Sequence, residues 1–181
     1  MKKPLALLLL FLTFFPILIF LQVSPSKAQT SGDWPMFRLN PAHTGYITEE
    51  INLKPPLELK WKFVTPAGAM GSPIVIGDTL VVRGSSLYGL NAGNGSIKWT
   101  RPLKSTSHTS PAASNDTIYV GSGAHPTCSG CGIEALDKNT GNLKWSLEFS
   151  PKGARDPNVS DGSLYFGSDD WYVRAVNAYT G

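Results

Sequence analysis

The chemistry that this sequence could carry centres on its two cysteines, Cys128 and Cys131, which are separated by two residues in a glycine-rich stretch. His125 lies three residues before Cys128, and the three side chains could bind zinc, although a structural zinc site needs a fourth ligand and none lies nearby in the sequence. A thioredoxin-type redox pair needs its first cysteine at a helix N-terminus, and no helix is predicted here. The pattern favours a disulfide that closes a small local loop, with zinc binding and redox catalysis as alternatives.

Carboxylates are the second candidate chemistry. Asp169 and Asp170 are adjacent in a predicted strand-end loop, and Glu134 lies within a predicted strand. Adjacent acids in a loop are most often solvated, so none of the three can be assigned as a general base. His43 and His108 each stand alone, and we predict structural or surface positions for them. The sequence therefore predicts no catalytic residue and no metal ligand with a defined role.

The N-terminus has the pattern of an export signal. Lys2 and Lys3 precede an apolar tract of 19 residues, from Leu5 to Val23, and Ser26-Lys27-Ala28 places small residues two apart. The tract is longer than most signal peptides and long enough to span a bilayer, so residues 1–28 are either a cleaved signal peptide or a retained anchor that contacts the membrane. Both interpretations predict export of the rest to the periplasm or outside the cell, where disulfides form.

The charge of the exported part argues against nucleic acid as a partner. The chain has 16 Lys and Arg and 13 Asp and Glu, but three of the lysines lie before residue 29 and all of the acids lie after it. The exported part is therefore neutral, and it has no basic cluster with interleaved aromatic residues. Contact with a protein or a glycan suits it better.

The elements that must position these residues form a repeat. Trp61, Trp99 and Trp145 are 38 and 46 residues apart, and a proline follows each tryptophan by 12 residues. After each proline come a turn, a β-branched or aromatic run, a second run and a second turn that ends in glycine. Each unit is thus four short strands joined by tight turns, and the second unit is lengthened by the stretch from Gly123 to Gly132.

A period of about 40 residues with four strands per unit is typical of β-propeller blades. We therefore predict an all-β chain of four-stranded antiparallel blades that follows an N-terminal hydrophobic helix. Residues 29–56 lead into the blades, and residues 57–181 form an incomplete ring of about two to three blades, with an isolated fourth strand around Leu57 to Phe63. The tryptophans should be buried between neighbouring blades rather than stack on a ligand.

The stretch from Ala135 to Trp145 resembles the docking motif Ala-x-Asp-x-x-x-Gly-x-x-x-Trp of pyrroloquinoline-quinone (PQQ)-like propeller repeats, in the superfamily of quinoprotein alcohol dehydrogenases. Residues 89–99 carry the motif with Gly for Ala and Asn for Asp, and residues 175–181 carry its first part. Asp33 to Gly45 is similar to the segment that leads into the first blade of these proteins. The docking residues implied by this resemblance are Trp61, Trp99, Ala135, Asp137, Gly141 and Trp145.

The resemblance implies two kinds of function. Some members are dehydrogenases that hold PQQ and calcium near the ring axis, with adjacent cysteines against the quinone, whereas Cys128 and Cys131 are not adjacent. Others are non-catalytic propellers that bind partners through loops and rims. We expect a binding or assembly scaffold without a cofactor, and the alternative is the N-terminal part of a PQQ- and calcium-dependent dehydrogenase.

The number of blades raises a further expectation. An open arc would leave apolar faces and strand edges bare. We expect missing blades to complete the ring, because the chain is a piece of a longer or truncated protein, or another chain to complete it in an oligomer.

Overall fold

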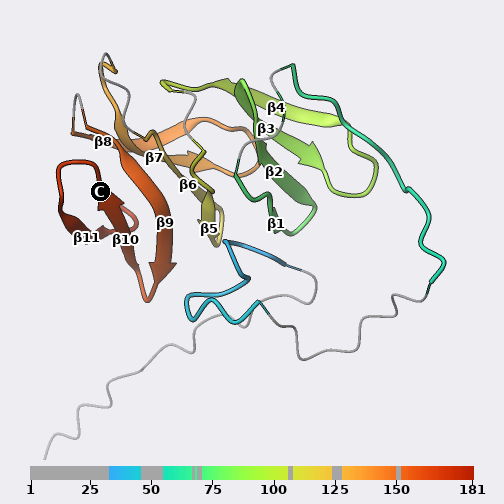
Figure 1. Ribbon diagram of the computed structural model, residues 1–181, viewed down its shortest axis with the longest axis horizontal. Helices are drawn as coiled ribbons and strands as arrows, with labels where there is room; N and C mark the ends of the chain where they lie inside the picture. Colours follow the sequence, from blue (N-terminus) through green and yellow to red (C-terminus); the bar gives the residue numbers. More distant parts are fainter. Residues whose placement is uncertain are drawn as a thin grey trace, which may run out of the picture.

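The computed structural model describes residues 33–45, 55–66, 68, 71–105, 108–123, 128–149 and 152–181, and these residues form an all-β protein. Three antiparallel sheets follow one another along the chain, in the strand orders β1-β2-β3-β4, β5-β6-β7-β8 and β11-β10-β9 (Figure 1). The prediction of antiparallel blades is confirmed, and the third blade has three strands. The strands are β1 (Ile74–Ile76), β2 (Thr79–Arg83), β3 (Ser86–Asn91), β4 (Ile97–Pro102), β5 (Ala112–Ser114), β6 (Thr117–Gly121), β7 (Gly132–Asp137), β8 (Leu143–Glu148), β9 (Ala154–Ser160), β10 (Ser163–Ser168) and β11 (Val173–Asn177).

The chain reverses within each blade by tight turns because the turn residues accept a positive φ. Gly77 has a φ of 60° in the turn between β1 and β2, and Asn115 has a φ of 54° in the equivalent turn of the second blade. Glycine and asparagine tolerate this conformation better than other residues. The turns hold the strands in simple antiparallel register, with Ile74 opposite Val81 and Ile76 opposite Thr79.

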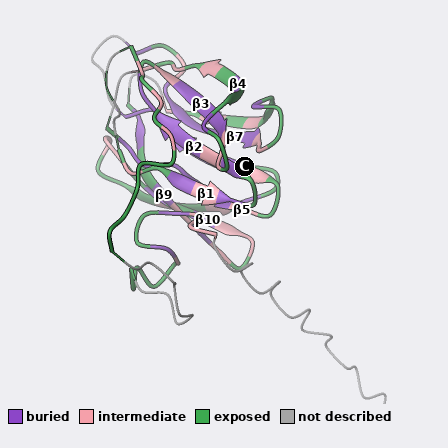
Figure 2. Ribbon diagram, turned by 90° about the vertical axis from the view of Figure 1, so that its right-hand side faces the viewer, coloured by how far each residue is buried: buried purple, intermediate pink, exposed green. Residues whose placement is uncertain are grey.

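Apolar side chains fill the space between neighbouring blades. One cluster joins Ile74, Val81 and Leu87 of the first blade to Ile118 and Leu136 of the second. A second cluster joins the second blade to the third. Figure 2 shows that the buried residues follow the central strands of the blades. A blade on its own would expose these faces, so the blades stabilise one another by burying them.

The tryptophan of each fourth strand packs onto the turn of the following blade. Trp99 Nε1 donates a hydrogen bond of 2.8 Å to the Lys138 carbonyl, and a Cβ at Gly141 would lie 2.7 Å from the Trp99 ring. Trp145 makes the equivalent hydrogen bond of 3.1 Å to the Ala178 carbonyl. Glycine is required beneath the ring, both for space and because Gly141 has a φ of 71°.

The segment of residues 33–45 lies across the edge strands of all three blades. Trp34 exchanges backbone hydrogen bonds of 2.7 and 2.8 Å with Val75 of β1, and Ala113 of β5 donates to the Pro35 carbonyl at 2.7 Å. Asn158 of β9 lies 2.9 Å from His43 Nε2. This segment lies below β1 and β5 in Figure 1. We call it the strap, because its backbone and side chains tie the three blades together.

One predicted strand is wrong. Residues 57–65 are not a strand, although the side chains of Trp61, Phe63 and Thr65 alternate inward as they would in one. A strand needs a neighbouring strand to receive its backbone hydrogen bonds, and no strand of the described residues is hydrogen-bonded to this segment. Trp61 instead packs on Gly95 and donates a hydrogen bond of 3.1 Å to the Ala92 carbonyl.

The predicted leader, residues 1–28, and residues 29–32 and 46–54 of the lead-in lie outside the described residues. Within the described part of the chain, no helix is long and apolar enough to cross a membrane.

Candidate functional site

The two ends of the blades differ. The turn end carries the turns between the first and second strands and between the third and fourth strands, such as those at Gly77 and Asn139. The loop end carries the connections between the second and third strands and between blades. The disulfide, Glu134 and the pair Asp169-Asp170 all belong to the loop end. We therefore take the loop end as the candidate functional site.

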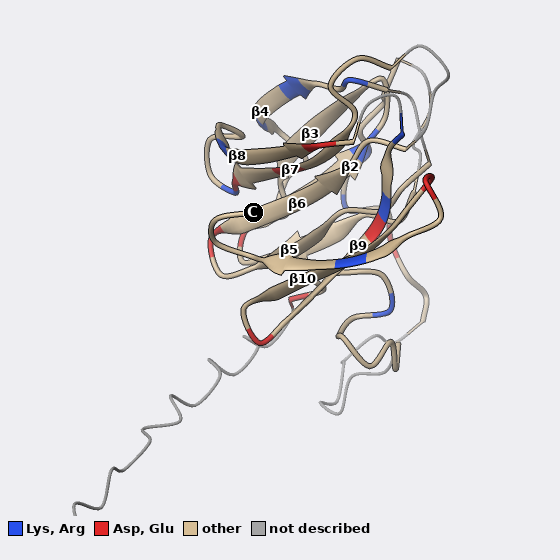
Figure 3. Cartoon of the chain, turned by 90° about the vertical axis from the view of Figure 1, so that its left-hand side faces the viewer, with Lys and Arg blue, Asp and Glu red and all other residues tan. Residues whose placement is uncertain are grey.

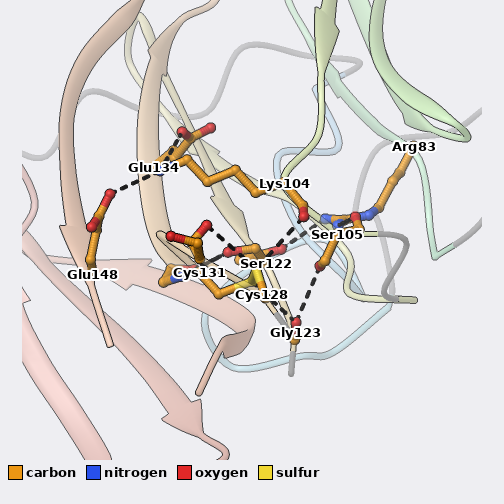
Figure 4. Close-up of a disulfide and its surroundings, with 12 residues drawn as sticks. Arg83, Lys104, Ser105, Ser122, Gly123, Cys128, Cys131, Glu134 and Glu148 are labelled. Carbon is orange, nitrogen blue, oxygen red and sulfur yellow. Dashed lines mark hydrogen bonds and ion pairs between the residues drawn. A yellow bond between two sulfur atoms is a disulfide. The ribbon is translucent and has the colours of Figure 1, made fainter. Parts of the chain in front are cut away.

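The disulfide loop connects β6 to β7. Cys128 and Cys131 are joined by a disulfide, and the base of the loop is held by Ser122, whose backbone N–H donates to the Gly132 carbonyl at 2.9 Å. The Gly132 N–H donates in turn to Ser122 Oγ at 2.7 Å. A Cβ at Gly132 would collide with the Leu147 carbonyl, so only glycine fits there. Figure 4 shows the disulfide beside Ser122 and Gly123.

The sulfur atoms of this disulfide are not presented to solvent. Cys131 is fully buried and Cys128 is 6% exposed. A disulfide sulfur is also not the thiolate that binds zinc or attacks a disulfide. His125, the third ligand of the zinc alternative, lies outside the described residues. The geometry makes the disulfide a brace for the loop.

Glu134 is held by two cations. Arg101 of β4 donates to both carboxylate oxygens of Glu134 at 3.2 Å, and Lys104 Nζ lies 3.6 Å from one of them. Lys104 also bonds Glu148 of β8 at 3.1 Å (Figure 4). Glu134 is 8% exposed, so the cluster is a partly buried ionic link between the first and second blades. A carboxylate used in this way is poorly placed to act as a base.

Arg83, at the end of β2, is the most deeply buried charge of the described residues. It is 1% exposed, and it donates to Thr109 Oγ1 at 3.0 Å and to the Gly121 and Ser105 carbonyls at 2.8 and 2.9 Å. Burial lowers the pKa of Arg83 to about 10, an effect opposed by the charge of Asp156. Arg83 therefore joins the first blade to the second from beneath the loop end.

Asp169 and Asp170 each form an ion pair with a different arginine. Arg155 Nε bonds Asp169 at 2.7 Å, and Arg174 bonds both oxygens of Asp170 at 2.6 and 2.8 Å. The hydrogen bonds and charge of Arg174 hold the pKa of Asp170 far below its ordinary value. Both carboxylates are therefore engaged in ion pairs in the structure.

Next to these acids, Trp171 is 98% exposed and has a φ of 73°, and Tyr172 is 64% exposed. A positive φ is unfavourable for a bulky residue, so the hairpin must hold Trp171 in this position. Arg174 contributes by lying over the Tyr172 ring, 5.1 Å from its centroid, and over the Phe149 ring at 4.6 Å. The result is an ordered aromatic tip at the loop end.

The remaining sequence candidates lie elsewhere. His43 is exposed in the strap, and His108 is exposed just before Thr109. No group of three or more His, Cys, Asp or Glu side chains that could hold a metal ion occurs within the described ranges. Basic and acidic positions are interspersed along the strands and loops of the blades (Figure 3).

Sequence reasoning missed Arg83, the bridge of Arg101 and Lys104 to Glu134, and the tip at Trp171. Arg83 had one signal, a single charge at the end of the otherwise uncharged strand Thr79–Arg83. The bridge joins residues about 30 positions apart in sequence, and only the packing of blades brings them together.

The PQQ and calcium of the dehydrogenase alternative can be tested against these donors. The two cysteines are buried, and Glu134, Asp169 and Asp170 are all paired with cations. A calcium ion needs several carboxylate or carbonyl oxygens directed at one point. No such group of carboxylates occurs among the residues that the structure describes, and we derive no step through PQQ or calcium.

Comparison with known families agrees with the repeat. A family model described as outer membrane protein assembly factor BamB matches residues 57–130. The matched segment, which is less than half of the chain, is similar to PQQ-like propeller repeats. No curated protein matches the chain.

Solved structures with the same fold include dehydrogenases and BamB. A quinohemoprotein alcohol dehydrogenase from Pseudomonas putida HK5 is 23% identical, with a TM-score of 0.66 over 83% of this chain. A europium-containing methanol dehydrogenase is 25% identical, with a TM-score of 0.67 over 83%. BamB from Moraxella catarrhalis is 23% identical, with a TM-score of 0.54 over 67%. This chain covers 25%, 31% and 37% of those three proteins, respectively.

Proposed function

We propose that this protein is a non-catalytic scaffold that acts outside the cytoplasm and binds a protein partner through its loop end. The observation that carries the proposal is the tip at Trp171, where a 98% exposed tryptophan is held in a positive-φ conformation. Tryptophan, tyrosine and arginine are the residues that dominate binding energy in protein interfaces. Tyr172 and Arg174, in the same hairpin as Trp171, supply the tyrosine and the arginine of such an interface.

The carboxylates of the loop end form ion pairs with arginines, which supports binding rather than catalysis. Glu134, Asp169 and Asp170 are each neutralised by an arginine, and the disulfide braces a loop at the same end of the blades. A rigid surface binds with less loss of conformational entropy. The match of residues 57–130 to a family described as an outer membrane protein assembly factor favours assembly of membrane proteins as the process served.

The experiment places a photo-cross-linking amino acid at position 171 in the organism that makes the protein, with position 139 at the turn end as the control. A discrete cross-linked protein from position 171 alone is expected. That protein is then purified and its affinity measured, and Trp171→Ala should weaken binding at least tenfold. Equal binding by the wild-type chain and Trp171→Ala would contradict the proposal.

The dehydrogenase alternative has its own test. The purified chain is incubated with PQQ, calcium chloride and a primary alcohol, and reduction of an artificial electron acceptor is followed. The scaffold proposal predicts no quinone binding by fluorescence and no reduction above that of the free cofactor. Saturable quinone binding with alcohol-dependent reduction would replace the scaffold by the enzyme.

A further inference from the structure

The disulfide at the loop end is hydrogen-bonded to the residue on which the aromatic tip rests. The Cys131 carbonyl accepts a hydrogen bond of 2.8 Å from the Phe149 N–H. The Phe149 ring in turn packs against Arg174, whose guanidinium carbon is 4.6 Å from the ring centroid. One backbone hydrogen bond and one ring contact therefore connect Cys131, in the second blade, to Arg174, in the third.

Arg174 is the residue that fixes the tip. It bonds both carboxylate oxygens of Asp170 at 2.6 and 2.8 Å, and it lies 5.1 Å from the centroid of the Tyr172 ring. Asp170 and Tyr172 flank Trp171, whose φ of 73° is unfavourable for a bulky residue. Such a conformation persists only when the surrounding structure enforces it. A displacement of Arg174 is therefore expected to let Trp171 relax.

The other side of the tip hairpin is bonded to the base of the disulfide loop. The Ser122 carbonyl accepts a hydrogen bond of 3.1 Å from the Ala154 N–H, and the Gly153 carbonyl accepts one of 3.1 Å from the Asp169 N–H. These hydrogen bonds involve no sulfur atom and do not depend on the S–S bond. Loss of the disulfide is thus expected to release the Phe149 side of the hairpin and to leave the blade itself in place.

The site can hold both redox states of the cysteines. Cys128 Sγ lies 3.6 Å from the Lys104 carbonyl oxygen, and Cys131 Sγ lies 3.7 Å from the Gly123 carbonyl oxygen (Figure 4). A disulfide has no hydrogen to donate, whereas two thiols would each face an acceptor. Two thiols also need more room than one disulfide, and a protein interior is close-packed, so the backbone at Cys131 must move on reduction.

We propose that the disulfide is a redox switch for the aromatic tip. The disulfide form holds the tip through Phe149 and Arg174, and the dithiol form lets Trp171 relax. The switch is a regulation of the binding site described above, so this inference rests on the proposed function for its biological role. The contacts that carry it lie within the described residues of the second and third blades.

The reductant is a dithiol, either a small molecule or a dithiol protein. One of its thiolates attacks Cys128 Sγ, which belongs to the less buried cysteine. The S–S bond breaks, and Cys131 leaves as a thiolate that takes up a proton. The second thiolate of the reductant then attacks the reductant's own sulfur in the mixed disulfide, so that Cys128 leaves and is protonated. The reductant becomes a disulfide, and two electrons and two protons have passed to the protein.

The first test follows amide hydrogen exchange of the whole chain, oxidised or treated with dithiothreitol, with the fraction reduced given by mass after alkylation. Exchange should quicken about fivefold on reduction in residues 168–172, where the Trp171 N–H donates to the Ser168 carbonyl at 3.0 Å. The turn of residues 137–142, at the turn end, is the internal control and should not change. A chain that dithiothreitol leaves oxidised, or a hairpin that exchanges equally in both forms, overturns the proposal.

The second test removes the ring contact. Phe149→Leu keeps the N–H that bonds Cys131 but loses the aromatic face against Arg174, so the hairpin should exchange rapidly in both redox forms. Phe63→Leu, the matched change, should keep the wild-type redox response, because Phe63 packs on Tyr88 in the first blade. Wild-type exchange by oxidised Phe149→Leu overturns the proposed route to the tip.

The cysteine-free chain makes the result independent of the reagent. Cys128→Ser/Cys131→Ser should exchange at the hairpin as the reduced wild type does, with or without dithiothreitol. Photo-cross-linking from position 171 then separates this inference from the proposed function. Equal cross-linking to a discrete protein in both redox forms would overturn the switch and leave the proposed function standing. A hairpin that responds to reduction, with no cross-linked protein, would overturn the proposed function and leave the coupling standing.

Discussion

At the scale of single residues, the molecule is held by a repeated contact between a tryptophan and a glycine. The glycines beneath Trp61 and Trp99 are Gly95 and Gly141, and both have a positive φ. The tryptophan supplies the buried area and the turn carbonyl accepts its indole N–H, so no polar group is lost on burial.

Gly141→Ala tests this contact. The new Cβ would be 2.7 Å from the Trp99 ring in an unfavourable backbone conformation, and we expect the free energy of unfolding to fall by about 2–4 kcal/mol. Gly77→Ala is the control, because it also has a positive φ but has nothing within 4 Å of the new Cβ. It should cost only about 1–2 kcal/mol. If urea unfolding shows the same loss of stability for Gly141→Ala and Gly77→Ala, the tryptophan contact contributes nothing to the free energy of unfolding.

Asp137 opens the same turn and gives it a dependence on pH. Desolvation raises the pKa of Asp137, but hydrogen bonds from Thr140 and the Asn139 N–H, with the charge of Lys144, outweigh it and hold the pKa below the ordinary 3.8. The ionised form therefore stabilises the fold above pH 4, and this contribution is lost as the pH falls through the lowered pKa.

Asp137→Asn should remove that pH dependence. Asparagine holds the same position in the first blade, where Asn91 Oδ1 accepts hydrogen bonds from the N–H groups of Gly93 and Asn94 at 2.8 and 3.1 Å. The variant should thus resemble the wild type in melting temperature at pH 7 and lose less stability between about pH 5 and pH 2. A variant with the wild-type acid dependence would exclude Asp137 as its source.

At the scale of elements, the connection between β6 and β7 differs most from its counterparts. The disulfide reduces the conformational freedom of this connection in the unfolded chain. Ser122 forms three hydrogen bonds with Gly132 at the base of the connection. The two described ends of this connection are therefore held together at its base.

Replacing both cysteines by serine should lower the free energy of unfolding by about 2 kcal/mol, the loop-entropy value for a ring of four residues. Circular dichroism of the folded protein should change little, because the Ser122 contacts remain. Since the sequence has two cysteines, reduction of the wild type should reproduce the loss. A loss seen in the variant but not on reduction would mean that packing, not the covalent link, is responsible.

At the scale of the whole molecule, stability depends on links between blades. The strap crosses β1, β5 and β9, and Arg83 reaches from the first blade to carbonyls and a hydroxyl near the second. Such links are needed because each sheet buries its apolar faces only against its neighbours.

Arg83→Met should cost about 2–4 kcal/mol, because it leaves the partly buried Ser105 carbonyl and part of the buried Gly121 carbonyl without a donor. Arg155→Met is the matched control, since Arg155 is half exposed in its ion pair with Asp169 and such pairs contribute at most about 1 kcal/mol. Amide exchange should quicken in both β2 and β6 in the Arg83 variant. Exchange confined to β2 would argue against a link between the blades.

The repeat in the sequence determined much of this fold, because turn and strand residues act locally. Three features reflect contacts between residues that are close in the chain or one repeat apart. They are the positive-φ positions such as Gly141, the alternation within β10 and β11, and the spacing of the tryptophans. The strand predicted around Leu57 to Phe63 failed for the opposite reason, since a strand is made by its partner and not by its own sequence.

The sequence by itself determined the blades, the turns and the proximity of the two cysteines. Only the tertiary structure decided the burial of Arg83, the pairing of Glu134 with Arg101, the course of the strap and the exposure of Trp171. These features depend on how one blade packs against the next, where residues distant in the chain meet. Local sequence patterns carry no information on which side chains will face each other there, because geometry and desolvation at the contact select them.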